Sequence, residues 1–159
     1  MTLASLNSSP PLLGGGARAE YAVLLVQLGG RRYGLPLAAV ERVLPMASVL
    51  ALPDASQGLL GMLNLHGEVV PVIDPRRHLG LGSPRISPDH RLVLLGGASC
   101  RFLVWVDAVE EVVSEAASAL TVVPTGPSNP LVPRVLRLGD EMVPVLAPAA
   151  LEPRSGPAR

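Results

Sequence analysis

The sequence predicts an all-β protein built from two copies of one small β unit. Three observations support this prediction. Short aliphatic and β-branched runs recur along the chain, and turn residues separate them at a spacing typical of β-sandwiches and small barrels. Two blocks of sequence occur twice in the same order. Helix signals, by contrast, extend over no more than one or two turns.

The first strand is expected over residues 21–28. It is closed by Gly29-Gly30 and resumed at Tyr33, which is the pattern of a hairpin with a short glycine loop. Further strands are expected where similar apolar runs end at Gly, Pro, Asn or Asp, namely at 63–65, 69–73, 92–95, 102–106, 135–138 and 142–146. The runs are short, so they predict a sandwich or small barrels.

One short helix is expected after the strand at 69–73. Asp74 is a favourable N-cap, and Pro75 fits the first helical position. The helix should run through Leu79 and stop at Gly80. Residues 1–20, rich in Ser, Pro and Gly, are expected to be a flexible leader, and 153–159 a frayed tail. The folded body is therefore predicted to span 21–152.

The internal repeat pairs residues 33–44 with 102–113, an offset of 69, and residues 65–75 with 138–148, an offset of 73. Each copy is close to the lower size limit for an independent core, so the two should pack into one body. The halves are placed at about 21–82 and 83–152, between which strands can be exchanged. Both copies contain a Val-Pro-Val segment, at Pro71 and at Pro144. Proline lacks a ladder donor, so these strands are expected at a sheet edge or a bulge.

Composition excludes several classes of function. The chain carries 13 basic and 13 acidic residues, and its few aromatic residues stand outside basic runs, which argues against a nucleic-acid partner. All the basic residues are Arg; without Lys there is neither a phosphate-binding P-loop nor Schiff-base chemistry. No apolar run reaches the roughly 18 residues needed to cross a bilayer. The N-terminus lacks a secretory signal pattern, so a cytoplasmic protein is expected.

The sequence offers no active site and no metal site. Cys100 lies in a turn-like segment with no His near it in sequence, which favours inert packing over nucleophilic catalysis. The three histidines are 12 residues apart, outside compact ligand motifs, and there is no second Cys. Neighbouring carboxylates on a strand point to opposite faces, so Glu110 and Glu111 cannot act as an acid–base pair. Capping or turn roles explain Asp74 and Asp107. We therefore expect no cofactor, no bound metal and no catalysis.

One motif points to a family. The segment 61–74, Gly-Met-Leu-Asn-Leu-His-Gly-Glu-Val-Val-Pro-Val-Ile-Asp, resembles the signature of CheW-like chemotaxis coupling domains, roughly G-[VI]-[VI]-N-L-R-G-x-[VI]-[VI]-P-V-[VI]-D-L-R. Tyr-Gly-Leu-Pro-Leu at 33–37, Val-Glu-Arg-Val-Leu-Pro at 40–45, Leu-Pro at 52–53 and Val-Trp-Val-Asp-Ala-Val at 104–109 are similar to other elements of that family. The resemblance covers about residues 21–152.

The resemblance implies a fold of two packed five-stranded SH3-like β-barrels without enzymatic activity. It implies an adaptor that joins the cytoplasmic tip of a methyl-accepting chemoreceptor to the regulatory domain of a histidine kinase. Such a protein meets the membrane only indirectly, through receptor arrays. Receptor contact would fall in a groove between the barrels, where an apolar helical tip fits with a few polar contacts. Carried over by motif, the receptor-binding residues are Val40, Glu41, Val43, Leu63, Leu65, His66, Val106, Asp107 and Val109. The motifs do not place the kinase contact.

The chain departs from the family pattern at several positions. His66 stands where the family usually has Arg, Pro75 where it has Leu, and Ala147 where it has Asp, and the segment 125–133 is short and rich in proline. These departures fit an adaptor of an accessory chemosensory pathway, governing gliding, pili or gene expression. Two further alternatives remain open: a two-barrel domain that serves a different scaffold, and an unrelated small β-barrel enzyme.

Overall fold

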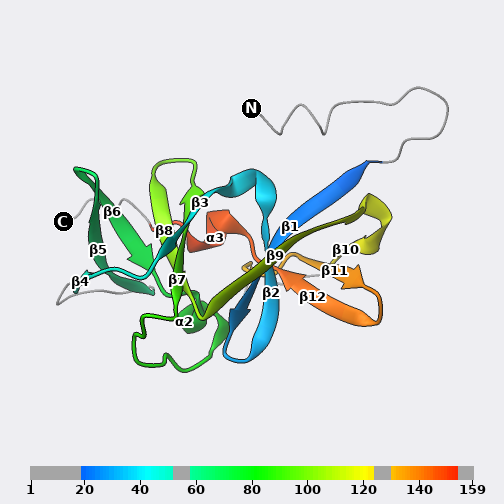
Figure 1. Ribbon diagram of the computed structural model, residues 1–159. Coiled ribbons are helices and arrows are strands. Elements are labelled where there is room, and N and C mark those ends of the chain that lie inside the picture. The colour runs from blue at the N-terminus through cyan, green and yellow to red at the C-terminus, as the bar shows by residue number, and fades with distance from the viewer. Residues whose placement is uncertain (1–18, 52–57, 124–129, 154–159) are drawn as a thin grey trace.

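The protein is described by a computed structural model, which places residues 19–51, 58–123 and 130–153. The described residues form two six-stranded sheets, seen side by side in Figure 1. The first sheet has the order β10 (Leu120–Val122), β11 (Arg134–Leu138), β12 (Glu141–Val145), β2 (Arg31–Pro36), β1 (Glu20–Leu28), β9 (Ala108–Ala116). The second has the order β3 (Val40–Pro45), β7 (Arg91–Gly96), β8 (Arg101–Val106), β6 (Glu68–Ile73), β5 (Leu59–Leu65), β4 (Leu50–Ala51).

The two sheets have the same architecture, and they exchange a hairpin. When β1–β6 are matched in order with β7–β12, the strand order of one sheet becomes that of the other. The hairpin β1–β2 from the first half of the chain lies between β12 and β9 of the second half. The hairpin β7–β8 from the second half lies between β3 and β6 of the first. Each exchanged hairpin also forms a parallel pairing with a strand of the other half. Val145 of β12 pairs with Gly34 of β2, and Val72 of β6 pairs with Leu103 of β8. The duplication is thus visible in the fold.

The exchanged hairpins are buried on both faces, as expected from their near-continuous apolar sequences. Alternate residues of the two hairpins, such as Leu24 and Val26 of β1 and Phe102 and Val104 of β8, pack together in a core between the sheets. The residues between them point the other way. Val23 and Leu25 enter a core enclosed by the first sheet, and Leu92, Leu94, Leu103 and Trp105 enter a core enclosed by the second. Each sheet therefore curls around its own interior, and the central core joins the two.

Most sequence predictions about the elements are confirmed. The all-β class holds, and each predicted strand appears, including the hairpin at Gly29-Gly30, whose positive φ angles are those of a type I′ turn. Each sheet has six strands where five were expected, because the short strands β4 and β10 each extend one edge. The pattern missed four strands, β3, β4, β9 and β10; none of their side chains is fully buried, so these strands lack a continuous apolar run.

The two Val-Pro-Val strands are not edge strands as expected, although the pairing of β5 with β6 contains a bulge between Leu59 and Gly61. Strands β6 and β12 lie inside their sheets, each with a neighbour on both sides. The prolines are tolerated because the parallel pairing with β8 or β2 is recorded only beyond them, at Val72-Ile73 and at Val145. Pro71 and Pro144 therefore precede the point at which a second neighbour takes up ladder bonds.

The helices are short. Helix α2 (Pro75–Leu79) begins and ends as predicted: the Asp74 carboxylate accepts a hydrogen bond from the Arg76 backbone N–H at 3.1 Å, and Gly80 closes the helix in the left-handed conformation. Helix α3 (Pro148–Leu151) occupies the equivalent place after β12, and Leu151 reaches the central core. Short 3₁₀ turns occur at Leu37–Ala39 and Ala117–Ala119. The predicted leader (1–20) and tail (153–159) lie almost entirely outside the described residues.

We predict that the chain folds as one cooperative unit. A fragment ending near Gly82 would leave the second sheet without β7 and β8, and β1–β2 without β9 and β12. Its backbone groups and apolar faces would then lack their partners. A ¹H–¹⁵N NMR spectrum of the fragment should be poorly dispersed, and adding the fragment from 83 to 159 should restore dispersion. A native-like spectrum of the first fragment alone would contradict this.

Candidate functional site

The predicted receptor-binding residues fall into buried and accessible sets. Leu63 is 6% exposed and belongs to the core inside the second sheet, and Val106 is fully buried in the central core. The Val106 side chain therefore offers no surface to a partner, and Leu63 reaches the surface only in the wall of an apolar groove. The remaining residues, which are at least partly accessible, are Val40, Glu41, Val43, Leu65, His66, Asp107 and Val109.

These accessible residues do not form one cluster. Val40 pairs with Leu95 near one end of β7, whereas Arg91 at the other end pairs with Val106. These two pairings are four residues apart along β7, which corresponds to a distance of about 13 Å. Glu41, Leu65 and His66 lie at the Val40 end, where β8 begins, and Asp107 and Val109 lie at the other end, where β8 stops. The structure therefore divides the predicted site into two groups.

The first group surrounds an arginine that sequence reasoning did not single out. Arg101, the first residue of β8, donates from Nε to the Glu41 carboxylate at 3.1 Å and from Nη1 to the Glu68 carboxylate at 2.6 Å. His66 is exposed in the β5–β6 turn two residues before Glu68, with a φ of 53°. The neighbouring Asn64 side chain accepts a hydrogen bond from the Gly67 backbone N–H at 2.8 Å, which fixes the turn. The sequence thus places His66 beside a Glu–Arg–Glu ion triad.

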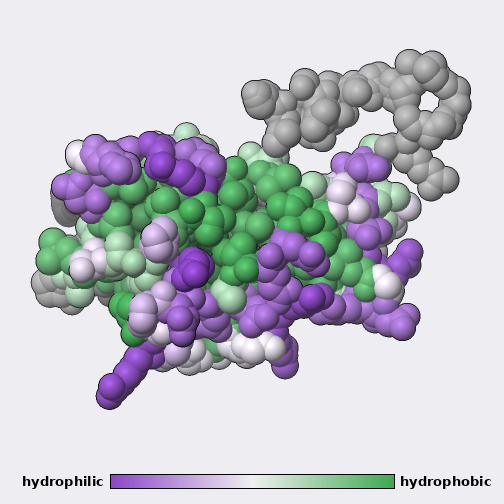
Figure 2. Space-filling model, viewed as in Figure 1, coloured by the Kyte–Doolittle hydropathy of each residue, from purple (hydrophilic) through white to green (hydrophobic). Residues whose placement is uncertain are grey.

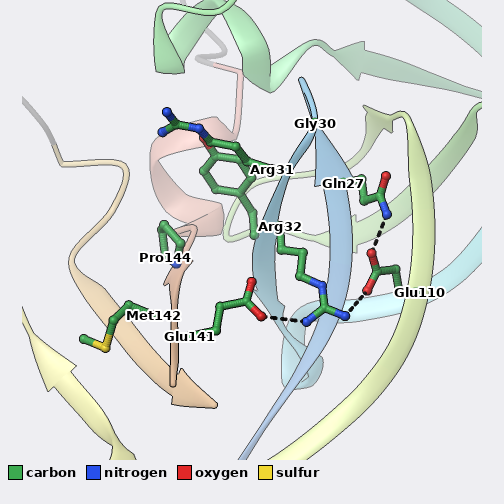
Figure 3. A pocket seen from close by; sticks show the side chains of 9 residues that line it. Gln27, Gly30, Arg31, Arg32, Glu110, Glu141, Met142 and Pro144 are labelled. Atoms are coloured by element: carbon green, nitrogen blue, oxygen red, sulfur yellow. Dashed lines mark hydrogen bonds and ion pairs between the residues drawn. The ribbon is translucent and has the colours of Figure 1, made fainter. Parts of the chain in front are cut away.

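The second group adjoins an equivalent triad on the other sheet, shown in Figure 3. Arg32 of β2 bonds the Glu110 carboxylate at 2.9 Å and the Glu141 carboxylate at 2.8 Å. Gln27 donates a hydrogen bond to the other oxygen of Glu110, at 2.5 Å. Glu110 first, and then Glu141, raises the pKa of Arg32 above its ordinary value. The triad lines a cleft of about 540 Å³ whose wall also includes Gly30, Arg31, Tyr33, Met142 and Pro144.

The two triads are copies of each other. The offset of 69 that relates the repeats converts Arg32 into Arg101 and Glu41 into Glu110, and the offset of 73 converts Glu68 into Glu141. In each triad the arginine comes from the exchanged hairpin and both glutamates come from the other half of the chain. Each triad is therefore a surface ionic contact between the two halves.

A third polar cluster is buried and links the sheets. The Arg76 guanidinium, which is fully buried, bonds the Asp74 carboxylate at 2.8 Å, the Asp107 carboxylate at 2.5 Å and the backbone carbonyl of Trp105 at 3.3 Å. Its carbon Cζ lies 4.3 Å from the centre of the Trp105 ring. The other Asp107 oxygen accepts from the Gly29 backbone N–H at 2.8 Å, in the β1–β2 turn. The cluster thus holds α2, the end of β8 and the turn of the exchanged hairpin together.

Three further hydrogen bonds complete this buried cluster. The Ser83 hydroxyl bonds the second oxygen of Asp74. The Trp105 indole N–H donates to His90 Nδ1 at 3.0 Å, and the Ser87 backbone N–H donates to the same nitrogen at 3.2 Å. Sequence reasoning assigned capping or turn roles to Asp74 and Asp107. Asp74 caps α2 as expected, whereas the Asp107 carboxylate bonds Arg76 and the Gly29 backbone N–H in the turn of another hairpin. Sequence reasoning missed that the two carboxylates converge on Arg76, although the arginine lies in the same motif.

The buried cluster has no copy in the second repeat. The positions equivalent to Asp74 and Arg76 are Ala147 and Ala149, and the position equivalent to Asp107 is Ala38. The turn of the other exchanged hairpin, β7–β8, is tied instead by Glu152. Its carboxylate accepts from the backbone N–H groups of Ala98, Ser99 and Cys100 at 2.7–3.0 Å. Cys100 is exposed in this turn, so the expected packing role is wrong.

An apolar groove crosses the outer edge of the second sheet. It has a volume of about 420 Å³ and is lined by Ser48, Val49, Leu50, Met62, Leu63, Asn64 and Val69. Leu50 and Val69 are 69% and 62% exposed, which is unusual for large apolar side chains on a well-packed domain. In the described ranges, no group of three or more His, Cys, Asp or Glu side chains is arranged to hold a metal ion. Nor does any helix in those ranges combine the length and hydropathy of a membrane span.

The fold and these surfaces define a two-subdomain β scaffold. Residues 22–154 match the CheW-like domain family, so the chain belongs to the CheW-like family. It is 36% identical over 76 residues to Protein FrzA of Myxococcus xanthus, a match that covers 48% of each chain. It is 23% identical over 104 residues to Chemotaxis protein CheW of Bacillus subtilis, covering 65% of this chain and 67% of that protein. The match to FrzA thus spans about half the length of that relative.

The fold is also similar to the crystal structure of the scaffolding protein TtCheW from Thermoanaerobacter tengcongensis. The TM-score is 0.72 with 24% sequence identity, over 80% of this chain and 88% of that one. This likeness confirms the two-subdomain SH3-like fold that the sequence motifs implied.

We predict that Arg76→Met lowers the free energy of unfolding by about 3–5 kcal/mol, because it leaves two carboxylates close together without their cation. Adding Asp107→Asn to Arg76→Met should recover part of the loss. Urea denaturation measures both effects. Arg77→Met is the matched control, since Arg77 is exposed on the same helix, and it should change little. Equal stability of Arg76→Met and the control would contradict a structural role for the cluster.

We also predict that Glu152→Gln makes Cys100 react faster. Burial first, and then the Glu152 charge, raises the pKa of the Cys100 thiol, so less thiolate is present at a given pH. Removing the charge should lower that pKa and shift the pH profile of iodoacetamide alkylation to lower pH. Cys100 is the chain's single cysteine, so the reaction reports on one site. Glu111→Gln, exposed on β9, should leave the profile unchanged.

Proposed function

We propose that this protein is a non-enzymatic adaptor that couples chemoreceptor cytoplasmic tips to a CheA-type histidine kinase. The observation that carries the proposal is the ordered match of family motifs across 22–154, including the segments that form β3, the β5–β6 turn and the β8–β9 junction. The protein would act in the cytoplasm, at receptor arrays attached to the membrane. The departures at His66, Pro75 and Ala147 favour an accessory chemosensory pathway with a non-standard receptor.

The geometry supports a receptor surface at the Arg101 end of the second sheet. Val40 and Leu65 are partly buried there, and Glu41 and His66 are accessible beside them. Val43, which is 39% exposed, lies farther along β3, paired with Val93 in the middle of β7. Apolar side chains flanked by a few fixed polar groups suit an amphipathic helical element. In Figure 2, hydrophilic residues gather over the turns of β5–β6 and β7–β8, with hydrophobic residues directly below them. We propose Val40, Glu41, Val43, Leu65 and His66 as the receptor-facing residues.

An adaptor must hold both partners at once, so they must occupy separate surfaces. Asp107 and Val109 lie about 13 Å from the Val40 end of β7, outside the proposed receptor-facing surface.

We therefore predict a ternary complex of this protein, a receptor cytoplasmic fragment and a kinase regulatory domain. Size-exclusion chromatography with light scattering should show all three components in one peak at the summed mass. The two binary mixtures serve as controls. Competition, in which added receptor fragment releases the kinase domain, would contradict the adaptor proposal.

A further inference from the structure

We propose that Arg101 is a specificity-determining residue, supplying the fixed cation of the receptor-facing surface that the family usually has at position 66. The inference rests on the proposed function, because it concerns the receptor-facing residues named there. Sequence motifs alone pointed to His66 as the departure of interest. In the structure an arginine from the other half of the chain, Arg101, bonds Glu68, two residues after that position.

Arg101 and position 66 share one neighbour. Glu68, which accepts the Arg101 hydrogen bond at 2.6 Å, pairs with Leu65 across the turn that contains His66. Arg101 also bonds Glu41, a residue of the proposed receptor surface, at 3.1 Å. A cation on the β5–β6 turn would therefore lie near Glu68, and a cation at the start of β8 reaches both Glu68 and Glu41. The positive charge that the family usually has on the β5–β6 turn is present here at Arg101, on the adjacent strand β8.

Arg101 keeps donors for a partner. A guanidinium carries five N–H groups, and the two bonds described here use one on Nε and one on Nη1. The Arg101 side chain is 39% exposed, so the remaining donors can reach solvent or a ligand. A helical hairpin tip offers suitable acceptors, because the last carbonyls of its first helix have no intrahelical partner. Carboxylates on the tip would be bound more strongly still.

The chain contains its own control for this proposal. Arg32 occupies the same place in the equivalent triad of the first sheet, with bonds of 2.8–2.9 Å to two glutamates and a side chain that is 37% exposed. Substituting either arginine removes the two ion pairs that it forms with glutamates of the other half of the chain. The structural cost of the two changes should therefore be similar, whereas receptor binding should depend on Arg101 alone.

The experiment titrates the full-length protein with a purified cytoplasmic hairpin fragment of its cognate methyl-accepting receptor, by isothermal calorimetry at low and high salt. Arg101→Gln should weaken binding about tenfold, and Arg32→Gln less than twofold. Arg101→Lys should be intermediate, because it keeps the charge but loses the planar fork. Adding His66→Arg to Arg101→Gln should restore binding to within about threefold of the wild type. Higher salt should narrow these differences. Urea denaturation confirms that all variants are folded.

The outcomes are distinct. Unchanged binding by Arg101→Gln, an equal loss in Arg32→Gln, or failure of His66→Arg to rescue would overturn the role of Arg101 while leaving the adaptor proposal standing. If the wild-type protein does not bind the receptor fragment, the proposed function fails, and this inference fails with it.

Discussion

The burial of one positive charge constrains the rest of this structure. Arg76 is enclosed where the second sheet meets the turn of a hairpin that belongs to the first, and Asp74 and Asp107 converge on its guanidinium, which offsets the cost of burying that charge. Both carboxylates are in turn held by the backbone, at the start of α2 and at Gly29. The position of each element at this junction is therefore linked to the others through a single guanidinium, and no one of them can shift without leaving a buried charge poorly paired.

The hairpin exchange explains why the ion triad occurs twice on the surface. Each exchanged hairpin brings an arginine to glutamates of the other half, so duplication of the chain duplicated an ion triad. The exchange also explains the central core. Both hairpins are apolar on two faces, and only a strand with a core on each side can bury such a sequence. Packing between the halves and ionic contact between the halves thus have one origin, the crossing of β1–β2 and β7–β8.

Much of this architecture could be predicted from the sequence, and the limits have physical reasons. Apolar runs such as 21–28 and 102–106 identify strands because burial selects them, whereas the exposed edge strand β3 leaves no such signal. The repeat indicated two units between which strands could be exchanged, but an internal match does not say which hairpin joins which sheet. The motif named Glu41 and His66 but not Arg101, since Arg101 reaches Glu41 only through the pairing of β7 with β3 and β8. Leu63 and Val106 matched the family pattern because they maintain the interior.

The second repeat lacks the charged cluster, so the two ends of the duplicated structure differ. One junction between hairpin and sheet is built on Asp74, Arg76 and Asp107, while the equivalent positions at the other junction are alanines. The two barrels therefore share the same strand order, but only one junction contains a buried charged cluster. A protein with an exact two-fold axis would present identical surfaces at its two ends, and a partner could bind in either orientation. Here the two junctions are chemically distinct, so the two ends of the protein are not equivalent.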